Sequence, residues 1–104
     1  MITKLKKEIW ETILKEVCKE IEVKPSDIVN KNRYHDAIKA RFILCKLAKD
    51  AGLDFYEISD LIKRGRCTIY NAIARYNDYY FSNPLFRRNA DNIISKLKCL
   101  NIYG

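Results

Sequence analysis

The chain of 104 residues is the size of one folded domain and leaves no room for a second. Its 20 Lys and Arg outnumber its 13 Asp and Glu, and the formal net charge of +7 favours a polyanionic partner such as nucleic acid. No apolar run resembles a secretion signal or reaches the ~18 residues of a membrane span, so we expect a soluble, cytoplasmic protein that binds no membrane.

A long amphipathic helix is predicted over residues 4 to 22, where apolar residues recur four positions apart beside a Lys- and Glu-rich remainder. Its apolar stripe is broad enough to form part of a core, whereas an exposed Trp10 would support dimerisation. A connector follows, in which Pro25 begins a single turn. A polar loop with Lys31 and Arg33 comes next.

The next helix is predicted from Asp36 until Gly52 ends it, and it is apolar on more than half of its circumference. Such a helix belongs at the buried centre of the domain. Arg41 interrupts its apolar pattern, so we expect this guanidinium to bond a carboxylate or a carbonyl, with a phosphate contact as the alternative.

Residues 54 to 80 have the pattern of a helix-turn-helix. Asp54 and Glu57 have the spacing of a capping box, which opens a first helix that ends at Gly65. The helix after it places apolar residues on one face and polar residues on the other. Asn83 and the proline after it start a last amphipathic helix. The whole pattern predicts an all-α fold, a compact bundle of about five helices that contains a helix-turn-helix.

Cations gather at this motif, since residues 31–75 carry ten Lys and Arg against five Asp and Glu. Arg66, at the start of the second motif helix, can donate two hydrogen bonds to the O6 and N7 of guanine, and Thr68 can contact a thymine methyl or a phosphate. Lys63 and Arg64 lie in the turn, where cations and free backbone amides bind phosphate. A loop arginine such as Arg33 can enter a narrow minor groove. The alternative for each cation is an ordinary solvated side chain.

Other kinds of chemistry find little support. The four cysteines form no CxxC pair and there is one histidine, so we expect no metal site. Three of the cysteines fall among apolar residues at helical spacing, which predicts buried, reduced thiols, while the redox behaviour of Cys67 stays open.

Motifs for catalysis, nucleotide or cofactor binding are missing, so we expect no enzyme. Aromatic residues between Tyr76 and Phe81 have a spacing that favours core and rim packing over a base-stacking platform.

The order and spacing of these segments resemble the C-terminal DNA-binding domain of the bacterial replication initiator DnaA, over roughly residues 12 to 97. The resemblance implies that Arg33 is the minor-groove arginine and that Arg64 to Thr68 form the signature that reads the initiator box in the major groove. The segments that carry it are 17–28, Lys31-Asn-Arg33, Ile38-Lys-Ala-Arg41 with 44–49, Glu57-Ile58, Thr68-Ile-Tyr-Asn-Ala72 and Asn83-Pro84.

The signature departs from the family pattern. The family usually has Gly-Arg-Asp-His-[Ser/Thr]-Thr-Val, whereas this chain has Arg64-Gly-Arg-Cys-Thr-Ile69, without the Asp and the His and with a turn about one residue shorter. Both lost side chains present hydrogen-bonding groups to bases, so we expect a different target sequence, with a change of ~1–3 kcal/mol per affected base pair. The initiator's ATPase domain is also absent, which argues against origin melting by this chain alone.

We therefore predict sequence-specific binding of double-stranded DNA by a regulator or replication accessory, of a phage or mobile element. One alternative is a helical protein-interaction module that has lost DNA binding and holds a partner protein through the Trp10 helix and the aromatic rim. Another is a transcriptional repressor acting as a symmetric homodimer. The residues predicted to contact DNA are Lys31, Arg33, Lys63, Arg64, Gly65, Arg66, Cys67, Thr68, Asn71 and Arg75.

Overall fold

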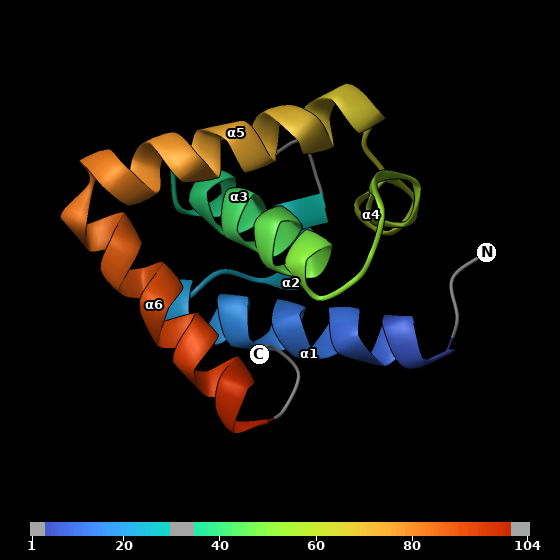
Figure 1. Cartoon of the computed structure of the whole chain (residues 1–104), viewed down its shortest axis with the longest axis horizontal. Helices are drawn as coiled ribbons and strands as arrows, with labels where there is room; N and C mark the ends of the chain where they lie inside the picture. Colours follow the sequence, from blue (N-terminus) through green and yellow to red (C-terminus); the bar gives the residue numbers. More distant parts are fainter. Residues whose placement is uncertain (1–3, 30–34, 101–104) are drawn as a thin grey trace.

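The computed structural model describes residues 4–29 and 35–100, and these ranges form six helices around one hydrophobic core (Figure 1). They contain no strand. The predicted all-α fold with its helix-turn-helix is confirmed, and the helix beyond the expected five is a five-residue segment that the sequence indicated only as a single turn. The helices are α1 (Lys4–Ile21), α2 (Pro25–Val29), α3 (His35–Asp50), α4 (Phe55–Ile62), α5 (Arg66–Ser82) and α6 (Pro84–Cys99).

Helix α3 occupies the centre of the molecule, as its apolar circumference predicts. In Figure 1, α5 crosses one side of α3, α1 runs along the other, and α6 packs against both of these outer helices. Ile43, Leu44 and Leu47 of α3 are completely buried as a result. Burial of each such side chain stabilises the fold by about 1.5–3 kcal/mol. Gly52, with φ at 112°, ends this segment in a conformation that side chains rarely adopt.

The ends of the motif helices are held by the caps that the sequence predicts. The Asp54 carboxylate accepts the Glu57 N–H at 2.8 Å, and the Glu57 carboxylate accepts the Asp54 N–H at 2.9 Å. This capping box satisfies two backbone donors at the start of α4. Lys6 of α1 also reaches the same Glu57 oxygen, at 3.1 Å, and so ties α1 to the motif. Asn83 caps α6 by accepting the Phe86 N–H at 3.1 Å.

The apolar stripe of α1 belongs to the core, as expected. Trp10 is only 4% exposed, because α1 packs against both α3 and α6 and encloses the indole. The alternative of an exposed Trp10 at a dimer contact is therefore excluded, while the expected burial of Cys99 proves wrong. Cys99 is exposed, because Leu97 is the last buried residue of the inner face of α6. Cys45 is buried as expected, and burial raises the pKa of its thiol to about 12, which leaves the group protonated and unreactive.

Candidate nucleic-acid interface

The turn between α4 and α5 is short and internally bonded. Lys63 adopts a left-handed conformation at φ 58°, and its N–H donates to the carbonyl of Ser59. The Arg64 N–H donates to the same carbonyl at 3.3 Å, while the Ser59 hydroxyl donates to the Arg64 carbonyl. Gly65 then accepts the Thr68 N–H at 3.0 Å and begins α5. These bonds fix the direction in which α5 leaves the turn.

Helix α5 separates its apolar and polar residues as predicted. Ile69, Ala72 and Tyr76 are buried. The opposite face therefore meets solvent, and its first turn is not covered by any described helix. The exposed residues of this face that the sequence predicted as DNA contacts are Arg66, Cys67, Thr68, Asn71 and Arg75.

An open hollow of about 480 Å³ lies between the starts of α4 and α5, and we call it the α4–α5 hollow. Tyr56 and Tyr70 are 63% and 65% exposed there, which is unusual for large aromatic side chains. The ring of Phe55 lies 6.0 Å from that of Tyr70, and the Lys49 ammonium lies 5.3 Å from the centre of the Phe55 ring. The residues that line the hollow are Phe55, Tyr56, Gly65, Arg66, Cys67 and Tyr70.

Arg66 is held against the wall of this hollow by Tyr56. Its Nη1 donates to the Tyr56 hydroxyl at 2.6 Å, and its guanidinium carbon lies 4.5 Å from the centre of the same ring. The sequence pattern predicts an exposed Arg66 but does not indicate Tyr56 or Tyr70. The two partners are ten residues apart, and only the geometry of the turn brings them together.

Three cations at this face form no ion pair within the described ranges. No carboxylate of the described ranges forms an ion pair with Lys63, Arg66 or Arg75. By contrast, the ammonium of Lys6 pairs with Glu57 of α4, and the ammonium of Lys46 pairs with Asp50 one turn further along α3. Gly65 is the N-cap of α5 and has no side chain that could bond the N–H groups of the first turn. These groups and the positive end of the helix dipole are therefore not covered by a capping side chain.

Arg41 of α3 is bonded to the end of α2. Its Nε donates to the carbonyl of Ile28 at 3.0 Å, which confirms the predicted carbonyl partner. Burial lowers the pKa of Arg41, and the nearby positive charge of Arg64 lowers it further. Arg41 is thus bonded to the end of α2 and lies close enough to Arg64 for the two charges to interact. Lys31 and Arg33 fall outside the described residues.

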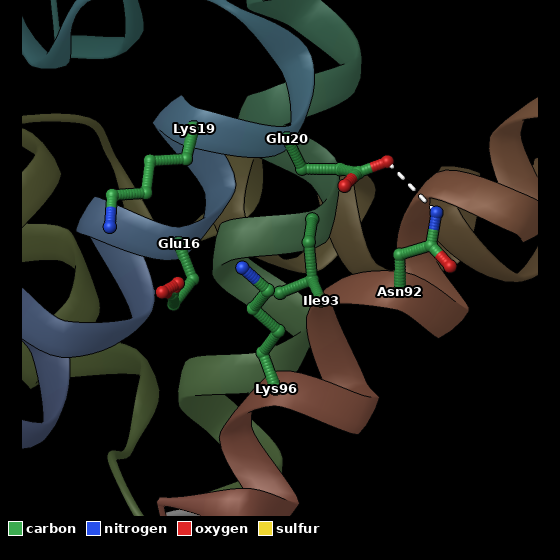
Figure 2. Close-up of a pocket in the computed structure, with 6 residues that line it drawn as sticks. All are labelled: Glu16, Lys19, Glu20, Asn92, Ile93 and Lys96. Atoms are coloured by element: carbon green, nitrogen blue, oxygen red, sulfur yellow. Dashed lines mark hydrogen bonds between the residues drawn. The ribbon is translucent and has the colours of Figure 1, made fainter.

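A second hollow lies between α1 and α6, and Figure 2 shows the six residues that line it. Here cations and acids are mixed: Lys19 and Lys96 lie beside Glu16 and Glu20, and Glu20 accepts a hydrogen bond from Asn92 at 3.1 Å. Glu16 is 8% exposed, and its Oε2 has no hydrogen-bond partner among the described residues. The amphipathic pattern of α1 did not indicate this buried acid. We call this site the α1–α6 hollow.

The aromatic residues near the end of α5 pack as core and rim, as predicted, with one exception. Tyr76 is buried and its ring lies 5.5 Å from that of Phe86, while Tyr79 stacks on Phe42 of α3 at 5.8 Å. Tyr80 is half-buried, but Phe81 is 78% exposed. These contacts attach the far end of α5 to the core, while Asn77, Asp78 and Ser82 remain exposed there.

Residues 10–75, more than half of the chain, match the family model of the bacterial dnaA protein helix-turn-helix. The match covers the turn and the exposed face of α5 as far as Arg75, and it confirms the resemblance for this part of the chain. Comparison with curated proteins and with solved structures gives no match. No helix of the described ranges is both long and apolar enough to cross a bilayer, and those ranges contain no cluster of three potential metal ligands.

Proposed function

The chain belongs to the bacterial DnaA helix-turn-helix family, and we propose that it binds double-stranded DNA at a specific sequence by placing the first turns of α5 in the major groove. The observation that carries this proposal is the exposed start of α5, where Arg66 and Lys63 have no acidic partner among the described residues. A helix that is apolar on one face and cationic at its first turn is suited to groove insertion.

The base-reading residues are those at the outward face of the first two turns. Arg66 donates two hydrogen bonds to the O6 and N7 of guanine, and the small side chains of Cys67 and Thr68 contact neighbouring base edges or a thymine methyl. Asn71 lies one turn further along and has the amide geometry that pairs with adenine. Support for these roles comes from the exposure of all four side chains on one face of α5.

The phosphate-binding residues surround this face. Lys63 and Arg64 lie in the turn and Arg75 lies further along α5, so together they contact both sides of the groove. Gly65 has open space where a side chain would stand, which allows a phosphate to approach the free N–H groups of the helix start. Such contacts position the helix and contribute affinity that falls with salt.

Lys31 and Arg33 complete the interface from the segment after α2, with Arg33 in the adjacent minor groove. Support comes from Arg41 of α3, whose Nε donates to the Ile28 carbonyl near the end of α2 and whose pKa is lowered by the charge of Arg64 in the motif turn.

We assign this DNA binding to a regulator or a replication accessory of a phage or mobile element, acting in the cytoplasm. The 104 residues contain no phosphate-binding loop for ATP, so the activity that they supply is recognition and not strand melting. The compact arrangement of the six helices around one core supports a single DNA-binding domain.

Selection of duplexes from a random DNA pool tests the proposal. The unmodified chain should enrich a defined motif, and Arg66→Ala should relax that motif at one or two positions, by about 1–3 kcal/mol per contact. Arg87→Ala is the matched control, since Arg87 also contacts a tyrosine ring but lies on α6. Recovery of no motif from the unmodified chain would refute sequence-specific reading.

The rival function is a protein-interaction module that keeps the fold without DNA binding. Its expected anchor at Trp10 is buried, whereas Phe81 of the aromatic rim is 78% exposed. Salt distinguishes the two functions: affinity for duplex DNA should fall steeply between about 50 and 200 mM salt, whereas an apolar protein interface should change little. Sedimentation with and without duplex DNA separates a monomer from a homodimer that needs two half-sites.

A further inference from the structure

The contact between Tyr56 and Arg66 joins two exposed side chains across the helix-turn-helix. Tyr56 is the second residue of α4 and Arg66 is the first residue of α5. The hydroxyl accepts from Nη1 at 2.6 Å while the ring lies under the guanidinium, 4.5 Å from its carbon. One contact restricts the direction of the guanidinium and the other restricts its plane, so the two together define its orientation.

We propose that Tyr56 is a positioning residue for DNA recognition: it aligns Arg66 so that guanine is read by the pair and not by a freely rotating arginine. This inference rests on the proposed function, because it concerns how the same surface selects its base. An arginine side chain has many rotamers, and a partner that restricts them before binding lowers the cost of ordering.

The hydrogen bonds available to the pair are sufficient for this role. A guanidinium has five N–H donors, and the bond to Tyr56 occupies one of them. Two of the remaining donors satisfy the O6 and N7 of guanine. The Tyr56 hydroxyl accepts the arginine bond and keeps its own hydrogen, which can be donated to an acceptor on the DNA.

A tyrosine suits this position better than an acid. A carboxylate would also hold the guanidinium, but it would cancel the positive charge that attracts DNA. The ring of Tyr56 orients the cation and leaves its charge intact. At the other end of α5, the Arg87 guanidinium lies 5.7 Å from the centre of the Tyr80 ring, and there the Tyr80 hydroxyl donates to Asp91 at 2.7 Å. The tyrosine of this second pair is thus bonded to an acid, as expected of a contact that stabilises the fold.

The fold does not depend on the Tyr56 side chain. It is 63% exposed, whereas α4 is attached to the core through Ile58 and Ile62, which are completely buried. Substitutions at Tyr56 should therefore leave a folded protein whose DNA recognition can be measured.

The test uses the full chain and the duplex that it selects from the random pool. Each guanine of that duplex is replaced in turn by 7-deazaguanine, which lacks the N7 acceptor, and the loss of affinity is measured. The guanine read by Arg66 is the one at which Arg66→Ala abolishes this loss. For the unmodified chain we expect a loss of about tenfold there.

Tyr56→Leu removes both the ring and the hydroxyl, and it should reduce that loss to about threefold or less. Tyr56→Phe keeps the ring, so its loss of affinity at this guanine should lie between those of the unmodified chain and Tyr56→Leu. Affinity for an unrelated duplex should change less than about twofold in either variant, because charge is unchanged. Tyr80→Leu, the matched control at the second arginine–tyrosine pair, should retain the full effect.

An undiminished or larger discrimination in Tyr56→Leu would overturn the inference, since Tyr56 would then be irrelevant or would hold Arg66 away from the base. The inference also fails if no guanine shows sensitivity to Arg66. These results differ from failure of the proposed function, in which the unmodified chain selects no motif at all.

Discussion

The α4–α5 hollow and the α1–α6 hollow both contain cations, but the side chains beside those cations differ. In the first, Arg66 lies on a tyrosine ring, and no carboxylate of the described ranges pairs with it. In the second, Lys19 and Lys96 stand beside Glu16 and Glu20 (Figure 2). The comparison indicates that the number of cations alone does not distinguish the proposed DNA-binding surface from the α1–α6 hollow. The two differ in that Arg66 has no ion-pair partner among the described residues.

The strongest way to break this comparison is to place an acid in the α4–α5 hollow. Tyr56→Glu should weaken binding to the selected duplex by about 2 kcal/mol or more, because the new carboxylate repels phosphate and pairs with Arg66. Thermal stability should not fall, since Tyr56 is exposed in the first turn of α4 and a negative charge at a helix N-terminus is favourable. Phe81→Glu makes a comparable change at an exposed aromatic residue near the end of α5 and should bind DNA almost normally. Equal losses in a binding titration of both variants would show that overall charge decides.

The α1–α6 hollow should respond in stability and not in DNA binding. Glu16→Met replaces a buried acid, one oxygen of which has no partner among the described residues, by an apolar chain of similar length. We expect about 1 kcal/mol of added stability in denaturant unfolding, with m unchanged. DNA affinity should stay the same. A loss of stability would mean that the neighbouring lysines compensate the buried charge.

Lys63→Gly tests both stability and DNA affinity at one position of the turn that we propose contacts DNA. Glycine relieves the left-handed conformation of Lys63, so the free energy of unfolding should rise by about 0.5–1 kcal/mol. Loss of one phosphate contact should lower the slope of log affinity against log salt by about 0.9. Opposite changes in stability and affinity are the expected signature. An unchanged salt slope would remove Lys63 from the interface.

The smallest expected effect is at the start of α5. Gly65 has an ordinary φ of −68° and caps the helix without a side chain. Gly65→Ser should add a capping hydrogen bond and a few tenths of a kcal/mol, measured as a small rise in the unfolding midpoint. The hydroxyl would also occupy the free N–H groups, so DNA affinity should fall slightly. A gain in both would indicate that the open glycine has no part in phosphate binding.

Most of the fold could be predicted from the sequence because its signals are local. The capping box of Asp54 and Glu57, the cap at Asn83 and the glycine after α3 each act within a few residues, and the structure has all three. The apolar circumference of α3 likewise requires neighbours on every side. Helix existence and order follow from such features without knowledge of tertiary contacts.

The site was predictable only for the residues that a helical projection places on one face. Exposure of Arg66 and burial of Ile69 follow from the periodicity of α5. The Tyr56–Arg66 contact does not, because it depends on the left-handed residue in the turn. Burial of Glu16 depends on how α6 covers α1, and no local pattern contains that information.

The shared carboxylate of Glu57 connects the reading end of the molecule to residues beyond the family match. Lys6, its partner on α1, precedes the matched segment, which begins at Trp10. A shortened chain that starts at Trp10 would leave this enclosed carboxylate without a counterion while it still capped α4. Truncation at a distant terminus would thus loosen the motif turn without removing any residue of the proposed DNA-binding surface.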